Sequence, residues 1–252
     1  ELLELNDTCD VATFGRNHEN VHDETYRRAG KLDSAHFSVK VDLLNSGLLD
    51  LICDDLLDDD YEERGIRAEM YKLNVYGKDS FFKPHVDTPR GQSMFGTLVI
   101  VFPPPHDGGS LILRHHDEEW TFDSGRMLSE QQEPSLAYVM FFSDVEHEVM
   151  PVKSGYRVTV TYNLYFSQDR YPAPSATPLM DTSALELKTV FQTLLDDPTF
   201  LPQGGRIAFA LSHRYPIDVV KQSIDTVARH LKGRDAKLRK ICHQLSLATD
   251  LR

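Results

Sequence analysis

The region between residues 66 and 166 is divided into short apolar segments that are separated by glycine and proline. Each segment is rich in the β-branched and aromatic residues that favour strands, and many short strands with such turns are typical of a sandwich, jelly roll or barrel. The predicted strands are residues 66–76, 95–102, 109–115, 119–122, 137–143 and 156–166. The sequence therefore predicts a mainly β core.

The residues before this region follow other patterns. Residues 1–35 are polar with little periodicity, and we expect an irregular arm that lies over the domain. Residues 42–58 place leucine and isoleucine at helical spacing, which predicts an amphipathic helix with an acidic outer face.

The residues after the β region predict helices that flank the core. The expected elements are a Pro/Ser-rich linker at 167–182, a helix at 183–195, a strand at 206–212 and a further helix from about residue 219. The predicted domains are an N-terminal arm with a supporting helix (1–65), a β core (66–166) and a C-terminal part with linker, helices and an additional strand (167–252).

The net charge of the chain is −12, which argues against a nucleic-acid or anionic-membrane partner. Many of the acids lie in one run, residues 50–63, which we interpret as a solvated helix face and loop. An acidic surface of this kind favours a basic peptide or a small molecule as the substrate.

The chain has three scattered cysteines, Cys9, Cys53 and Cys242, without a CxxC or zinc-binding spacing. We expect free thiols in a reducing compartment. There is no signal-peptide pattern, and no apolar run reaches the about 18 residues that a membrane helix needs. The prediction is an intracellular enzyme, cytoplasmic or nuclear, without a membrane partner.

The run KPHVDT contains the first candidate site residues, His85 and Asp87. Residues two apart on a strand project to the same face. An imidazole and a carboxylate are two of the three ligands in the facial triad of non-haem iron(II) oxygenases. The candidate third ligand is His147, which follows a predicted apolar strand. Ten residues later, Arg157 could form a bidentate pair with the far carboxylate of a dicarboxylic acid.

From about residue 69 to residue 166 the chain resembles the catalytic core of the prolyl-4-hydroxylase-like branch of the iron(II)/2-oxoglutarate oxygenase superfamily. The resemblance is carried by the runs YGKDSFFKPHVDT, FGTLVIVFP…GGSLILRH and FFSDVEHEVMPVKSGYRVTVTYNLYF. The outer segments FGRNHENVHDETYRRAGKLD and LKGRD are similar to little-characterised fungal members.

The resemblance implies a double-stranded β-helix (jelly roll) core with the ligands at its open end. It matches His85, Asp87 and His147 to the catalytic iron ligands, and Arg157 and Tyr76 to residues that bind the 2-oxoglutarate C5 carboxylate. Thr161 lies four residues beyond Arg157 on the same strand face, and could donate a further hydrogen bond. Many relatives carry tryptophan at the position of Asn163.

The implied cofactors are Fe(II), 2-oxoglutarate as a co-substrate and dioxygen, with ascorbate as a supporting reductant. The implied reaction couples oxidative decarboxylation of 2-oxoglutarate to hydroxylation of a C–H bond.

Other polar and aromatic residues near these motifs have simpler interpretations. We expect His106 in a surface loop, and Tyr71 in the core because its offset of five from Tyr76 places the two on opposite strand faces. His115 and His116 point to opposite faces, so at most one faces the barrel. Arg90 is either a solvated loop residue or a contact to substrate.

Three functions remain open from the sequence. The first is a hydroxylase of a protein or peptide side chain. The second uses the same chemistry on a free amino acid or specialised metabolite. The third is a catalytically silent jelly-roll binding module, which the intact ligand pattern disfavours.

Overall fold

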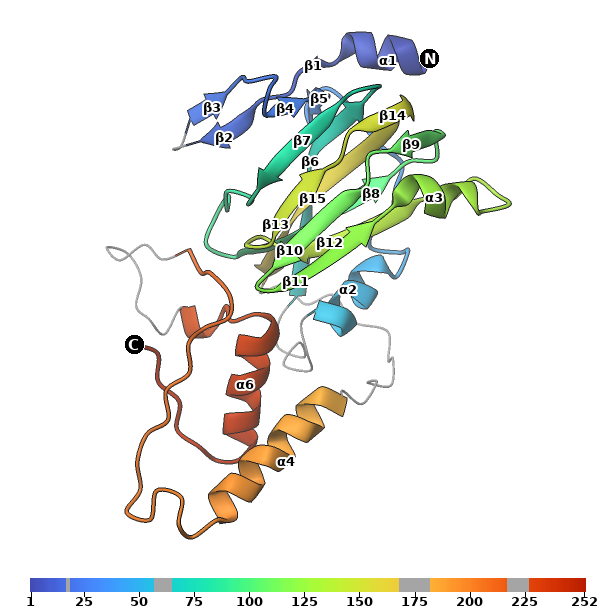
Figure 1. Ribbon diagram of the computed structural model, residues 1–252. Helices are drawn as coiled ribbons and strands as arrows, with labels where there is room; N and C mark the ends of the chain where they lie inside the picture. Colours follow the sequence, from blue (N-terminus) through green and yellow to red (C-terminus); the bar gives the residue numbers. More distant parts are fainter. Residues whose placement is uncertain (17–18, 57–64, 168–181, 217–226) are drawn as a thin grey trace. The chain divides into compact units, whose positions relative to one another are not determined.

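The computed structural model describes residues 1–16, 19–56, 65–167, 182–216 and 227–252 (Figure 1). The chain divides into two compact units, which are described separately. The first unit comprises residues 1–41 and 67–165, and the second comprises residues 42–66 and 166–252.

Two antiparallel sheets form most of the first unit (Figure 1). The six-stranded sheet has the order β1 (Asp10–Val11), β5 (Gly30–Asp33), β6 (Gly65–Tyr76), β15 (Arg157–Ser167), β8 (Met94–Val101) and β12 (Ala137–Phe142). The five-stranded sheet has the order β11 (Glu118–Phe122), β10 (Leu111–His115), β13 (Glu146–Val149), β7 (Phe81–His85) and β4 (Arg27–Arg28). Smaller elements are β14 (Val152–Gly155) with β9 (His106–Gly108), β2 (Phe14–Arg16) with β3 (Glu19–Val21), α1 (Leu2–Thr8) and α3 (Ser124–Ser129).

From β6 onward the chain passes repeatedly between the two sheets. Strands β6, β8, β12 and β15 belong to the larger sheet, while β7, β10 and β13, which lie between them in sequence, belong to the smaller one. This alternation is the winding of a double-stranded β-helix, so the predicted mainly β jelly-roll fold is confirmed.

The predicted strands of the core are confirmed. Most of them bury side chains between the sheets, whereas β11 is largely exposed. All eight residues of β8 are buried, as expected for a strand that is covered on both faces. Its Val99 and Val101 belong to one cluster with Phe82, Leu111 and Val149 from the other sheet. This cluster holds the two sheets together next to the cavity described below.

The prediction of an irregular N-terminal arm is wrong. Strands β1 and β5 pair with each other, and β5 extends the larger sheet beside β6. Strand β4 forms the edge of the smaller sheet by pairing with β7. These strands have two to four residues, which is too short to show a period of two in the sequence.

The second unit contains helices together with segments that have no regular secondary structure. Its helices are α2 (Leu48–Leu56), α4 (Thr182–Asp196) and α6 (Gly233–Gln244). The helix predicted at 42–58 begins later, at Leu48, and residues 57–58 lie outside the described residues. The helix predicted at 183–195 is confirmed. Most of the predicted linker, and the start of the helix predicted from residue 219, lie outside the described residues.

The strand predicted at 206–212 does not form. Its apolar side chains, Ile207, Phe209 and Leu211, are exposed. The end of this segment is instead held by the buried carboxylate of Asp235, which accepts hydrogen bonds from the backbone N–H groups of Ser212 and His213. An alternating apolar pattern predicts a strand only where a partner strand is available.

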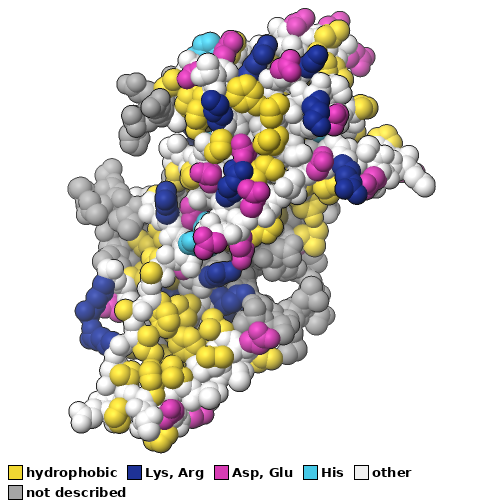
Figure 2. All heavy atoms as spheres, in the orientation of Figure 1, with side chains coloured by type: hydrophobic (Ala, Val, Ile, Leu, Met, Phe, Trp, Pro, Cys, Tyr) yellow, Lys and Arg dark blue, Asp and Glu magenta, His cyan; other side chains and the backbone are white. Residues whose placement is uncertain are grey.

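Two of the three cysteines, Cys9 and Cys242, are free thiols, as predicted. Within the described residues, none of the helices has both the length and the apolar character that crossing a membrane requires. Basic and acidic side chains are interspersed on the face of the molecule shown in Figure 2.

Candidate metal and co-substrate site

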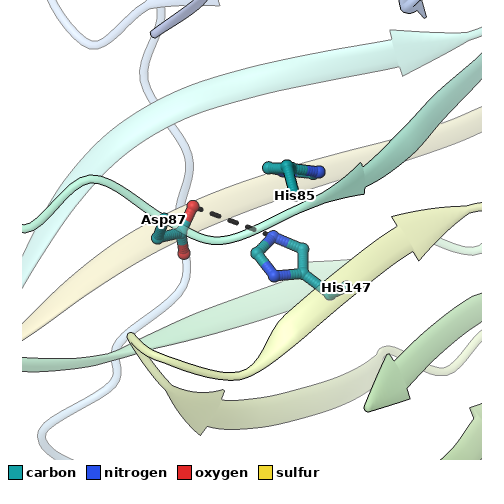
Figure 3. A group of neighbouring side chains, drawn as sticks. All are labelled: His85, Asp87 and His147. Atoms are coloured by element: carbon teal, nitrogen blue, oxygen red, sulfur yellow. Dashed lines mark ion pairs between the residues drawn. The ribbon is translucent and has the colours of Figure 1, made fainter. Parts of the chain in front are cut away.

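Three of the predicted site residues meet at one end of the smaller sheet. His85 is the last residue of β7, Asp87 follows two residues later, and His147 of β13 pairs directly with His85 across the strands. Their possible ligand atoms all lie within 4.8 Å of one another. Figure 3 shows the His147 ring turned toward the Asp87 carboxylate, with Nε2 3.7 Å from Oδ1. Two imidazoles and one carboxylate at this spacing form a donor set suited to iron(II).

The hydrogen bonds of the two histidines fix which nitrogen faces the cluster. Nδ1 of His85 lies 2.8 Å from the backbone oxygen of Lys83, and Nδ1 of His147 lies 3.1 Å from that of Val145. A carbonyl oxygen can only accept a hydrogen bond, so each Nδ1 carries the proton. The Nε2 lone pairs are therefore left for a metal.

The neighbours of the cluster favour the ionisation states that bind a metal. Burial, together with the nearby His147, lowers the pKa of His85 to about 3, so its imidazole is neutral at physiological pH. The hydroxyl group of Thr97 donates a 2.6 Å hydrogen bond to Oδ2 of Asp87. This bond holds the carboxylate with Oδ1 directed at His147.

The cluster borders a cavity of about 830 Å³ that also contains Arg157. Arg157 is 1% exposed, and its Nε and Nη2 have no hydrogen-bond partner among the described residues. Burial lowers the pKa of its guanidinium. A buried cation with unpaired donors is unfavourable unless an anion compensates it. The cavity therefore fits a ligand that carries a carboxylate.

The surroundings of Arg157 leave space for its side chain. Tyr76 is buried beside it, with 5.6 Å between the guanidinium carbon and the ring centroid. Gly109 has a φ of +70°, and a Cβ there would lie 3.0 Å from Cδ of Arg157 and 2.9 Å from Cγ2 of Val152. A glycine at this position allows both the turn and the close approach of Arg157.

Thr161 lines the same cavity, but its hydroxyl group donates to the backbone oxygen of Lys72 at 3.1 Å. Its hydrogen bond to a co-substrate stays a prediction. Sequence reasoning missed Thr159, which is buried and lines the cavity. Its offset of two from Arg157 could have identified it, because both residues face the same side of β15.

Several predictions for neighbouring residues are wrong. Tyr71 is half-buried and borders the cavity rather than lying in the core. The loop residue Arg90 packs over it, with its guanidinium carbon 4.4 Å from the ring centroid. His106 is half-buried in β9 rather than in a surface loop, and its ring nitrogens contact the oxygen of Pro104 and the hydroxyl group of Ser124. Burial lowers the pKa of His106.

Part of the cavity wall comes from the N-terminal arm, whose individual lining residues sequence reasoning did not single out. The arm residues that line the cavity are Thr13, Phe14, Gly15, Asp23, Tyr26 and Arg27. No spacing rule could have found them, since they reach the cavity through pairing with strands far away in the sequence.

Comparison with known proteins identifies the family. Residues 71–165 match the family model described as the 2OG-Fe(II) oxygenase superfamily, and this range contains all six predicted site residues. No curated protein matches the chain.

Similar solved structures include three prolyl hydroxylases. A prolyl hydroxylase from Trichoplax adhaerens, in complex with a hypoxia inducible factor oxygen degradation domain peptide fragment, is 19% identical with a TM-score of 0.44, over 65% of this chain and 74% of that chain. A Pseudomonas putida prolyl-4-hydroxylase is 17% identical with a TM-score of 0.40, over 62% and 77%. A viral collagen prolyl hydroxylase from Paramecium Bursaria Chlorella virus-1 is 12% identical with a TM-score of 0.37, over 56% and 80%.

The family match covers strands from both sheets, including the His/Asp/His cluster and the buried arginine that the geometry fits to a metal and a carboxylate. The cofactors of this family are Fe(II), 2-oxoglutarate and dioxygen. Residues 71–165 match the 2OG-Fe(II) oxygenase superfamily, and the protein is a 2-oxoglutarate-dependent dioxygenase.

Proposed function

We propose that this dioxygenase hydroxylates an unactivated C–H bond, in the manner of a prolyl hydroxylase, on a side chain of a protein or peptide. The proposed iron ligands are His85, Asp87 and His147. The proposed 2-oxoglutarate contacts are Arg157 and Tyr76, with Thr161 as the weakest because its hydroxyl proton is donated to the backbone oxygen of Lys72. The proposal depends on one observation, which is that the ligand cluster and an unpaired, buried arginine line the same cavity.

When bound, Fe(II) and 2-oxoglutarate use dioxygen to place one oxygen atom in the substrate C–H bond as a hydroxyl group and the other in succinate, with release of carbon dioxide. The chain contributes position and charge. The Lys83 and Val145 carbonyls hold the two imidazoles, while Thr97 holds the Asp87 carboxylate. Arg157 offers its unpaired N–H groups to the distal carboxylate of 2-oxoglutarate.

Aromatic rings pack against the two imidazoles of the proposed metal site. The Phe82 ring stacks on His85 with a centroid separation of 3.5 Å, and the Phe141 ring lies 4.6 Å from that of His147. A dry surrounding strengthens the electrostatic interactions of the bound co-substrate.

A macromolecular substrate is supported by the border of the cavity. Residues Val86, Thr88, Pro89 and Arg90 line it and are exposed to solvent. A side chain that projects from a protein surface could enter at this border. The volume of about 830 Å³ lies in the upper part of the about 300–1,000 Å³ that is usual for small-ligand sites, and would admit co-substrate and substrate side chain together.

The test is succinate formation by the purified protein with Fe(II), ascorbate and 2-oxoglutarate. We expect slow succinate release without added substrate, and none from His85→Ala. His36→Ala is the matched control, because His36 is exposed and does not line the cavity. Incubation with peptide mixtures should then yield products heavier by one oxygen atom. If wild-type protein released no succinate under any condition, the silent binding module would be the better interpretation.

A further inference from the structure

The cavity has the opposite charge to the chain as a whole. The chain carries a net charge of −12, whereas the cavity is lined by four basic side chains and two carboxylates. The basic residues are Arg27, Lys72, Arg90 and Arg157, and the acidic residues are Asp23 and Asp87. One arginine and one carboxylate of this set are already assigned to the co-substrate and the metal. The remaining residues give the substrate side of the cavity an excess of positive charge.

Arg27 is the most unusual of these residues. It belongs to β4 at the edge of the smaller sheet, and it is 7% exposed. Its Nη1 donates to the backbone oxygen of Thr13 at 2.6 Å, and its Nη2 donates to Oδ1 of Asn74 at 2.7 Å. Its Nε has no hydrogen-bond partner among the described residues.

Both hydrogen-bond partners of Arg27 are neutral. Among the described residues, no carboxylate forms an ion pair with its guanidinium. Taking an arginine out of water without a counter-charge is unfavourable, and neutral acceptors compensate only part of that loss. An anion bound in the cavity would supply both the missing charge and an acceptor for Nε.

Arg27 also lies close to the proposed metal site. Its guanidinium carbon is 4.4 Å from the centroid of the Phe82 ring, which in turn stacks on the imidazole of His85. The Phe82 ring therefore separates the guanidinium from a proposed iron ligand. A group bound to Arg27 would be held near the position at which a C–H bond is oxidised.

The border of the cavity is also lined by basic side chains, those of Arg90 and Lys72. The Arg90 guanidinium and the Lys72 ammonium lie 4.4 Å and 4.6 Å from the Tyr71 ring centroid. Lys72 has a distant ion pair with Asp33 at 3.9 Å, whereas the Arg90 side chain forms no ion pair among the described residues. Basic side chains at a cavity entrance attract anions.

We propose that Arg27 binds a carboxylate of the substrate, so that this enzyme oxidises a C–H bond close to an acidic group. The inference rests on the dioxygenase chemistry of the proposed function and narrows the class of substrate to carboxylic acids. The carboxylate could belong to a free amino acid or other small acid, or to an acidic residue or C-terminus of a peptide. Two sets of probes distinguish these sources.

The first experiment uses only the wild-type protein loaded with Fe(II), ascorbate and 2-oxoglutarate. One set of probes is the free amino acids with their carboxamides, and the other is a peptide mixture in which aspartate and glutamate are replaced in parallel by asparagine and glutamine. We expect carboxylate probes from one of the two sets to increase the rate of succinate release. The increase with the matching amides, which lack the charge, should be smaller by a factor of about ten or more.

The second experiment compares Arg27→Gln with Arg28→Gln. Arg28 is the neighbouring residue on β4 and is exposed, so it is the matched control. We expect Arg27→Gln to lower kcat/KM for the active carboxylate probe about tenfold or more, Arg27→Lys to restore part of it, and Arg28→Gln to leave it unchanged. The Kd for 2-oxoglutarate, measured by calorimetry, is expected to stay within about threefold of wild type in Arg27→Gln.

Three outcomes would overturn the inference. Amide probes could stimulate as well as acids, no carboxylate probe could stimulate at all, or Arg27→Gln could weaken 2-oxoglutarate binding as strongly as Arg157→Ala, which would make Arg27 a co-substrate residue. Each of these results leaves substrate-free succinate release by the wild type intact. Loss of that release would instead contradict the proposed function itself.

Discussion

The smaller sheet contributes His85 and His147 to the cavity, whereas the larger sheet contributes Tyr76, Thr97 and Arg157. On the smaller sheet, β7 and β13 are short and are held in register by a direct pairing of the two histidines. On the larger sheet, β8 and β15 are long and mostly buried. The smaller sheet thus carries the proposed metal ligands, and the larger sheet provides a rigid, dry wall for a carboxylate.

This difference implies that substitutions on the two sheets affect different steps. A change on the metal side removes a ligand and with it the chemistry. A change on the wall opposite weakens binding but leaves the metal ligands in place. Variants of single residues on each side can therefore separate the two contributions.

The largest effect is expected on the metal side. Asp87→Ala removes the only carboxylate of the ligand cluster and should reduce succinate release to background. Iron content after dialysis, measured by atomic absorption, should fall with it. Asp23→Ala is the matched control, because this carboxylate also lines the cavity but lies outside the cluster. Retention of full iron content by Asp87→Ala would contradict the ligand assignment.

A smaller but still large effect is expected on the opposite wall. Arg157→Ala should raise the Kd for 2-oxoglutarate about 100-fold, because two unpaired N–H groups of a desolvated guanidinium are lost as partners of the carboxylate. Iron content should not change.

The melting temperature gives an independent measure of the same arginine. 2-Oxoglutarate should stabilise the wild-type protein to heat by binding only the folded state, and this gain should be lost in Arg157→Met. Without the co-substrate, Arg157→Met should melt no lower than wild type, because it removes a buried, uncompensated charge. Equal stabilisation of both proteins by 2-oxoglutarate would exclude Arg157 as its partner.

A moderate effect is expected where the larger sheet supports the metal side. The Thr97 hydroxyl group donates to Asp87, so Thr97→Val removes the bond that orients this carboxylate while nearly keeping the side-chain shape. Outer-shell bonds of this kind typically change metal affinity about 10–100-fold, and we expect a value near the lower end. Iron titration measures it. Thr159→Val, a buried change on the same wall without a contact to the cluster, should leave iron affinity unaltered.

The same comparison explains which parts were predictable from the sequence. Residues 95–102 were predictable as a strand because their burial leaves a continuous apolar signal, and residues 156–166 because apolar residues recur at every second position. His85 and Asp87 were identifiable because two side chains on one strand face need only local spacing. No local spacing pointed to Arg27 as a cavity residue. Its contacts, Thr13 and Asn74, are distant in sequence and are brought to it by the pairing of very short strands.

Apolar alternation alone was also misleading at residues 206–212, where no strand forms. The pattern there resembles that of the core strands, but a strand is stabilised by its cross-strand neighbours rather than by its own residues. In contrast, the short segments β1, β4 and β5 form strands because the edges of both sheets offer them backbone partners. Both wrong predictions, the strand at 206–212 and the irregular arm at 1–35, therefore have the same cause, which is that strand pairing depends on residues distant in sequence.

The smallest effect is expected for Thr161, and it sharpens the description of the larger sheet. A threonine hydroxyl group has one proton, and in this structure it is donated to the backbone oxygen of Lys72. It cannot donate to a carboxylate at the same time, so Thr161→Val should change the Kd for 2-oxoglutarate by less than about threefold, compared with Tyr76→Phe, which should weaken it more. Calorimetric titration of both variants makes the comparison. A loss of tenfold or more in Thr161→Val would mean that the hydroxyl group rotates away from Lys72 when the co-substrate binds, and that this wall adapts to its ligand.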